Sequence, residues 1–156
     1  MKRPKKGWTF DSSLMANEEE KEKYRNDPIA TSELLFHIGW ALVDLAEQFE
    51  ARCVSLFSAV CFSKEMWDAV NFARLWPESN HAKINEVLSD ALGHLGDTHF
   101  MIESVYAWGE RVQTDTTFRN IEMDIKKALT LIRKAILLTD DYINDSMGGG
   151  EDAPTS

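Results

Sequence analysis

Three side chains of metal-binding type follow one another at helical spacing: Asp90, His94 and Asp97. Positions i, i+4 and i+7 share one face of a helix, so two carboxylates and an imidazole can converge on a cation. A metal site in a helical bundle usually draws its ligands from facing helices. The other predicted long helices place no carboxylate on their apolar faces. The alternative is a solvated helix face, and we expect neither a metal ion nor another cofactor.

A second pair of reactive side chains stands in the segment Arg74-Leu75-Trp76-Pro77-Glu78-Ser79-Asn80-His81. An arginine can stabilise a phosphate, and a histidine can transfer a proton. Over this octet the chain resembles the arginine-to-histidine motif of HEPN domains, helical-bundle proteins many of which are ribonucleases. The resemblance implies metal-independent RNA cleavage at a dimer interface by Arg74 and His81. The other interpretation is a solvated loop arginine and a histidine that caps a helix.

Basic residues repeat on the last predicted helix: Arg119, Lys126 and Arg133, flanked by Lys127 and Lys134. Seven-residue spacing aligns the first three along about 20 Å, which is long enough to follow a few phosphates. No aromatic residues interleave with them, so a solvated face or pairing with acids of a neighbouring helix is favoured. Those acids are Asp44, Glu47 and Glu50.

The charge and the cysteine content limit the expected partners and the expected cellular location. The 156 residues carry 26 acidic and 17 basic side chains, a formal charge of −9. An acidic body repels nucleic acid and anionic lipid, so neither partner is expected. Cys53 and Cys61 lie on one predicted helix about 12 Å apart, too far for a disulfide. We expect two buried thiols in a cytoplasmic protein. No run approaches the roughly 20 apolar residues of a membrane span.

Apolar residues recur in steps of three and four along most of the chain, and no segment alternates as a strand does. The pattern predicts a helix from Pro28, capped by Asp27, to about Phe62, then a shorter helix from Ser63 to Trp76. It predicts two further long helices, the ranges 80–112 and 118–142. The fold class is therefore an all-α antiparallel bundle of three long helices plus one or two short helices. Such spacing favours coiled-coil-like crossings of about 20°.

The predicted organisation has three parts. Residues 1–26 form a basic arm and a polar short helix, partly mobile, in which Trp8 and Phe10 are candidates to dock the arm. Residues 27–147 form the bundle. Residues 148–156 follow a glycine run and are expected to be a flexible tail.

Some apolar residues exceed what one bundle face requires. Phe36, Trp40 and Val43 form a second stripe beside the main one, and Leu131 and Leu138 lie off the main stripe of the last helix. Excess apolar surface must be buried against something, and Trp and Phe often anchor such contacts. These five residues are the predicted partner-binding site. The alternative is that the chain's own short segments cover them.

These patterns favour a non-enzymatic, acidic, cytoplasmic interaction protein. It is expected to self-associate and to bind or inhibit a protein partner, as antitoxins, immunity proteins, adaptors and phage-encoded inhibitors do. The alternative function is the HEPN-like ribonuclease that uses Arg74 and His81.

Overall fold

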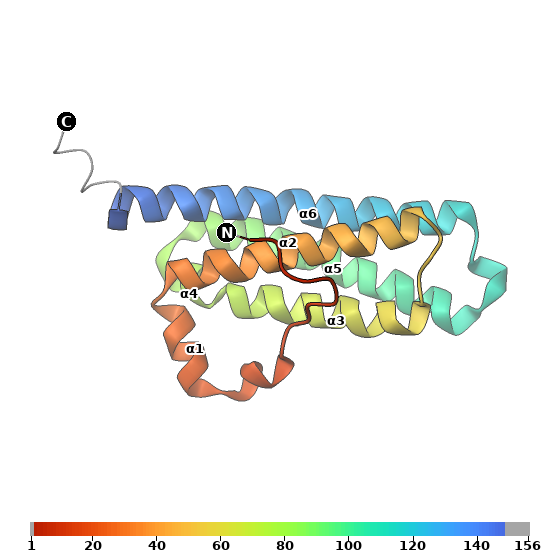
Figure 1. Cartoon of the computed structure of the whole chain (residues 1–156), viewed down its shortest axis with the longest axis horizontal. Helices are drawn as coiled ribbons and strands as arrows, with labels where there is room; N and C mark the ends of the chain where they lie inside the picture. The colour runs from red at the N-terminus through yellow and green to blue at the C-terminus, as the bar shows by residue number, and fades with distance from the viewer. Residues whose placement is uncertain (1, 149–156) are drawn as a thin grey trace.

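Four long helices form an antiparallel bundle in the computed structural model, which describes residues 2–148 (Figure 1). They run up, down, up and down in chain order, and no strand occurs among the described residues. The long helices are α2 (Pro28–Glu50), α3 (Leu56–Ala73), α5 (Ala82–Trp108) and α6 (Asp115–Ile143). The shorter elements are α1 (Glu18–Arg25), α4 (Leu75–Asn80), the 3-10 turns η1 (Ser12–Ala16) and η2 (Glu110–Val112), and the π-helical turn η3 (Asn144–Gly148). The predicted all-α antiparallel bundle is confirmed.

The break predicted between Phe62 and Ser63 lies instead at residues 51–55. The end of the first predicted long helix therefore joins the predicted shorter helix in α3, and the bundle has four long helices where three were predicted. The chain leaves α2 after Glu50 and enters α3 at Leu56. Arg52 takes a φ of 58° in this connection, a conformation that costs a non-glycine residue about 1 kcal/mol. Its Nε donates to Asp115 Oδ1 at 3.1 Å. Because this partner lies far along the chain, the local apolar pattern contains no signal for the break.

Side-chain caps fix where the long helices begin. The caps are Asp27 for α2, Ser55 for α3, His81 for α5 and Thr114 for α6. The predicted start of α2 is confirmed, because Asp27 accepts the backbone N–H of Ile29 at 3.0 Å and Pro28 follows it. Ser63, a predicted cap, instead lies buried inside α3. Its hydroxyl is 2.7 Å from His99 Nδ1, a partner from another helix.

Two helix ends also differ from the prediction. The helix expected to stop at Trp76 stops at Ala73, and Pro77 sits in the first turn of α4. A proline is tolerated there, because its missing N–H would have no partner within the helix. The helix expected to reach Val112 ends at Trp108. Gly109 has a φ of 79°, which takes the chain out of the helix.

The core is continuous, but its seams are unequally filled. Helix α6 packs closely on α2 and α5, and α3 packs on α5. Among these four neighbouring pairs of long helices, α2 and α3 have the smallest contact. The N-terminal arm fills part of this loose seam. Phe10 is buried with its ring centroid 5.6 Å from that of Phe72, and the ring centroid of Trp8 lies 5.3 Å from that of His37. The predicted tail lies outside the described residues beyond Gly148.

Candidate functional site

An apolar groove of about 370 Å³ lies between α2 and α6. Three of the residues predicted for partner binding, Phe36, Trp40 and Val43, line its α2 side and are half-buried. Ile136 and Leu137 line the α6 side, and Leu137 is 66% exposed. The molecule therefore has a concave apolar surface with an exposed leucine at its edge.

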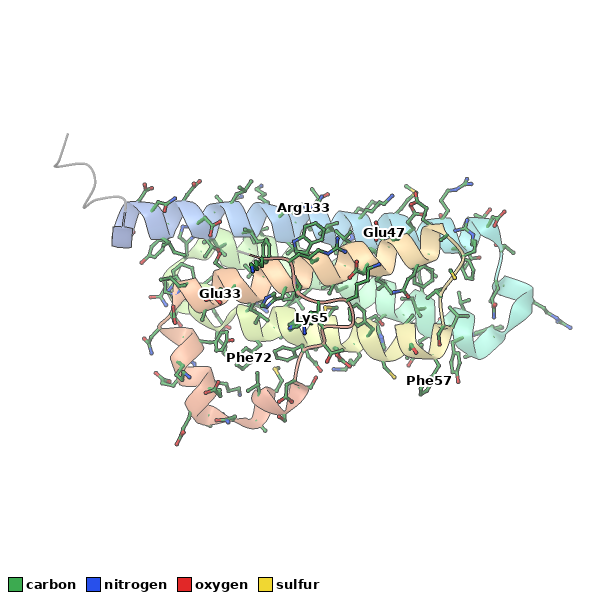
Figure 2. The ribbon with its side chains drawn as sticks, in the orientation of Figure 1. Lys5, Glu33, Glu47, Phe57, Phe72 and Arg133 are labelled. Atoms are coloured by element: carbon green, nitrogen blue, oxygen red, sulfur yellow. The ribbon has the colours of Figure 1, made fainter. Side chains whose placement is uncertain are left out.

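Charged side chains frame this groove. The guanidinium of Arg3 lies over the Trp40 ring, 4.2 Å from its centroid, and pairs with Asp44 at 2.5 Å. Arg133 lies exposed on the α6 side (Figure 2). The basic arm thus covers one face of Trp40, as the alternative interpretation anticipated, and the rest of the groove is left open.

The other two predicted partner-binding residues, Leu131 and Leu138, do not line this groove. Both are half-buried and pack against the core. Their seven-residue spacing from Asp124 places them on the face of α6 that meets α5, because seven residues make nearly two helical turns. The five residues grouped by the sequence pattern therefore belong to two separate surfaces.

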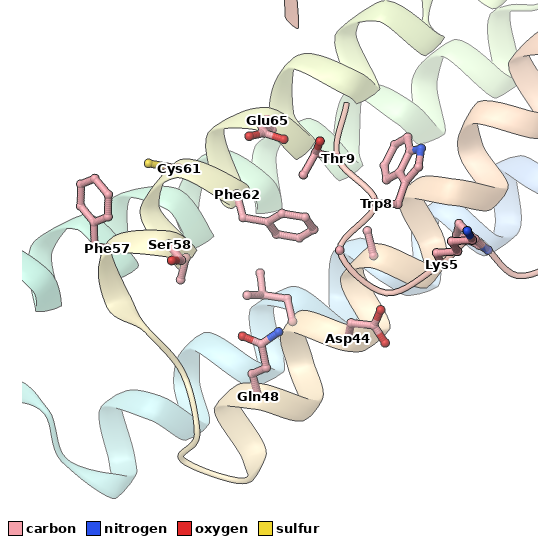
Figure 3. A pocket seen from close by; sticks show the side chains of 15 residues that line it. Lys5, Trp8, Thr9, Asp44, Gln48, Phe57, Ser58, Cys61, Phe62 and Glu65 are labelled. Atoms are coloured by element: carbon pink, nitrogen blue, oxygen red, sulfur yellow. The ribbon is translucent and has the colours of Figure 1, made fainter. Parts of the chain in front are cut away.

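A second cavity, of about 360 Å³, lies between α2 and α3 beside the N-terminal arm (Figure 3). Phe62 extends into it from α3, Asp44 and Gln48 lie on the α2 side, and the arm contributes Lys5 and Trp8. Its walls are mostly apolar with a few polar groups, which is the usual composition of a small-molecule site. Sequence reasoning missed this cavity, because it exists only where the arm lies across the seam.

Glu65 is the acidic group on the α3 side of this cavity. Burial raises its pKa above the ordinary value of 4.5; the backbone N–H of Phe10 opposes that shift, and the nearby Asp68 charge adds to it. Its Oε1 is buried and has no hydrogen-bond partner among the described residues. A carboxylate in this setting is destabilised until it meets a proton or another donor.

A polar cluster bridges α5 and α6. His94 Nδ1 lies 3.0 Å from Asp124 Oδ1, and Thr98 donates to Asp124 Oδ2 at 2.9 Å. Asp97 completes the group, because one ligand atom from each of His94, Asp97 and Asp124 lies within 4.8 Å of the others. Asp90, predicted as the third ligand, is exposed and lies outside this cluster.

The prediction that the other helices offer no inward carboxylate was wrong, because Asp124 is only 9% exposed on α6. The apolar pattern of α6 does not reveal this carboxylate, because Asp124 occupies a position at which the pattern allows either a polar or an apolar residue. Its burial is tolerated because His94 and Thr98 satisfy both carboxylate oxygens. The contact between Asp124 and His94 would follow from the relative register of α5 and α6, but the sequence alone does not give that register.

Arg74 and His81 both make structural contacts. Arg74 Nε donates to Asn85 Oδ1 at 2.9 Å, which joins the end of α3 to α5. His81 Nδ1 accepts the N–H of Ile84 at 3.3 Å and so caps α5. The imidazole also packs edge-on against Tyr142, with ring centroids 5.9 Å apart. Neither residue lines the groove or the cavity described above.

The predicted basic stripe is exposed but is not a uniform surface. Lys126 pairs with Glu122 at 2.7 Å, and this hydrogen bond is the main reason that the pKa of Lys126 is raised. Arg133 belongs to the α2–α6 groove, whereas Lys127 lies beside Asp97 and Asp124 on the α5 side. Arg119 and Lys134 are exposed. The basic residues therefore lie on more than one face of α6: Arg133 lies beside α2, and Lys127 lies beside α5.

Several large aromatic side chains are exposed on α5 and at the start of α3, a feature that the sequence analysis did not single out. Trp108 is 75% exposed and Phe100 is 68% exposed. Phe57, at the start of α3, is 62% exposed, and its ring centroid lies 6.0 Å from that of Tyr106 (Figure 2). The signal was present, because the aromatic residues of α5 lie off its main apolar stripe.

Both cysteines are free and exposed, so the expectation of buried thiols was wrong. The break between α2 and α3 is the cause. Cys53 falls in the connection and Cys61 near the start of α3, so the two no longer share one apolar helix face.

No protein-family model matches this chain, and neither a curated protein nor a solved structure matches it. Helix α2 is long and apolar enough to cross a membrane by length and composition, but 56% of its most apolar window is buried inside the bundle. Core helices meet the same criterion, so α2 is weak support for a membrane span.

Proposed function

We propose that this chain is a non-enzymatic interaction protein that self-associates through the α2–α6 groove and binds or inhibits another protein. The observation that carries the proposal is the groove itself. Phe36, Trp40 and Val43 form one wall, and the 66% exposed Leu137 stands at the opposite wall. An apolar groove with an exposed leucine at its wall is the kind of surface that becomes buried on association.

A second copy of the chain is the occupant that fits this surface. A two-fold interface brings the same patch of each protomer together, so it must hold both a cavity and a projection. The groove and Leu137 supply these two shapes side by side. Leu137 of one protomer can then enter the groove of its partner, and the reverse contact forms at the same time.

Electrostatics give this dimer a recognisable dependence on salt. Each chain carries a formal charge of −9, so two protomers repel each other at low ionic strength. The contact surface is mainly apolar, with Arg3 and Arg133 near it. Salt screens the repulsion more than it weakens apolar contact, so self-association is expected to strengthen as salt rises.

Binding of a further protein is supported by exposed aromatic side chains of α5 and α3 that do not line the groove. Trp108, Phe100 and Phe57 are each more than 60% exposed. Large aromatic residues supply much of the energy of protein interfaces. We place this activity in the cytoplasm, where exposed free cysteines remain thiols.

Light scattering of the purified chain tests the self-association. The expected mass is at least twice 17.8 kDa for the wild type and a single chain for Leu137→Glu. Met123→Glu is the matched control, because Met123 is a 51% exposed apolar residue of α6 outside the groove, and it should keep the wild-type mass. A monomeric wild type would refute the proposal, and so would equal loss of mass in both variants.

The ribonuclease alternative draws no support from the contacts of Arg74 and His81, because each is occupied by a helix-end interaction. Its test is separate. RNA cleavage that the wild type performs without metal and that His81→Ala loses, while remaining folded, would replace the proposal made here.

A further inference from the structure

The polar cluster between α5 and α6 is independent of the groove and lies on the other side of α6. Its members come from two helices: His94 and Asp97 from α5, and Asp124 from α6. Ligands from facing helices are the usual construction of metal sites in helical bundles. Asp124 is only 9% exposed, and one of its oxygens lies against the His94 imidazole while the other accepts from Thr98.

The distances fit a metal ion of ordinary size. Two neighbouring ligands of an octahedral ion with bonds of about 2.1 Å lie about 3.0 Å apart. His94 Nδ1 and Asp124 Oδ1 are 3.0 Å apart. The full set spans up to 4.8 Å, slightly more than such an ion allows, but Asp97 is exposed and its carboxylate can rotate inward.

The groups around the cluster orient it and set its charge. Thr98 holds Asp124 Oδ2, which leaves Oδ1 directed toward His94, as outer-shell hydrogen bonds commonly do for ligating carboxylates. Asp97 and Asp124 contribute two negative charges. Lys127 and Asn120 line the shallow pocket beside them, so one positive charge opposes the two carboxylates.

We propose that His94, Asp97 and Asp124 form a binding site for one divalent transition-metal ion. One nitrogen and two carboxylate oxygens suit Zn²⁺ and its first-row neighbours, whereas Mg²⁺ prefers oxygen ligands alone. The ion displaces the proton that lies between His94 Nδ1 and Asp124 Oδ1; this proton leaves to solvent or moves to Nε2, so the metal-bound imidazole is neutral with its hydrogen on Nε2. The exposed side of the cluster leaves coordination positions to water.

Calorimetric titration with Zn²⁺ alone tests this site. The protein is untagged, treated with a chelator, and carries Cys53→Ser and Cys61→Ser, because both thiols are exposed and can bind zinc themselves. The expected result is one Zn²⁺ per chain. Asp124→Asn should weaken the binding by about tenfold or more, since a ligand charge is lost. Mg²⁺ under the same conditions should bind far more weakly.

The matched control is Asp90→Asn, which removes an exposed carboxylate from the same helix outside the cluster and should change the affinity less than about twofold. Circular dichroism checks that each variant is folded. If Asp124→Asn is unstable, Asp97→Asn replaces it, because Asp97 is exposed and its loss does not open the core. Less than one tenth of an equivalent of zinc, or equal binding by the Asp90 and Asp97 variants, would overturn the proposal.

Discussion

Helix α6 faces two neighbours in two different ways. Toward α2 it presents Ile132, Ile136 and Leu137, and the seam is apolar but only partly filled. Toward α5 it presents Asp124, and the seam holds a polar cluster in which both oxygens of Asp124 have a partner. Apolar contact is non-directional and leaves a surface open to any complementary shape. Hydrogen bonds fix particular atoms at particular positions. One helix can therefore provide both an association surface and a defined ligand site.

The largest expected effect on stability distinguishes the buried floor of the α2–α6 seam, formed by Ile132, from its exposed rim, formed by Leu137. Ile132 is fully buried and its side chain reaches Gly39 of α2. Ile132→Ala should lower the free energy of unfolding by about 2–5 kcal/mol, because it leaves a cavity. Leu137→Ala should change the stability of the monomer by less than about 0.5 kcal/mol, since the leucine is 66% exposed. Urea unfolding at low protein concentration measures both, and similar losses would contradict the distinction between floor and rim.

The next effect tests the polar seam. Asp124→Ala should cost about 1–3 kcal/mol, because it leaves the donors of His94 and Thr98 without an acceptor. Asp124→Asn should cost less, since its amide oxygen can still accept one of these hydrogen bonds. Thermal unfolding in the presence of a chelator measures the pair. An alanine variant as stable as the wild type would mean that the hydrogen bonds contribute little.

In the seam between α2 and α3, replacing a carboxylate is expected to stabilise the protein, whereas replacing Asp124 destabilises it. Glu65 has a raised pKa and one buried oxygen with no hydrogen-bond partner in the described part of the chain, whereas both oxygens of Asp124 are hydrogen-bonded. A carboxyl that binds its proton more tightly when folded loses stability as pH rises from its ordinary pKa of 4.5 through the raised value. Glu65→Gln should therefore stabilise the protein slightly at neutral pH. It should also flatten the fall in melting temperature above pH 4.5, which calorimetry at several pH values measures.

The smallest effect on stability is expected for an exposed ion pair of α6. Lys126 and Glu122 form an i, i+4 ion pair at 2.7 Å, and Lys126 is exposed. Lys126→Ala should change the free energy of unfolding by less than about 0.5 kcal/mol, because exposed pairs of this kind are worth little. Chemical denaturation in low and high salt measures it. A loss above 1 kcal/mol would mean that surface pairing, rather than the filling of the seams, holds α6 in place.

Much of the fold could be predicted because it depends on local pattern. The steps of three and four placed α6, and the Asp27–Pro28 pair placed the start of α2. The break at Arg52 could not be predicted, because the guanidinium that stabilises it binds Asp115 from another helix. The candidate site shows the same division. Phe36 and Trp40, predicted from their excess over one apolar face, line the α2–α6 groove, whereas Leu131, predicted on the same ground, does not, because the sequence does not give the helix register.

The amino-acid sequence by itself determined an acidic, all-α chain with more apolar surface than a single helix face can bury, because periodicity and composition are properties of neighbouring residues. Only the tertiary structure decided that four long helices form, that Asp124 rather than Asp90 meets His94, and that the arm fills part of the loose seam between α2 and α3. These outcomes depend on contacts between residues far apart in the chain. Their energies arise only when the helices have taken one particular register.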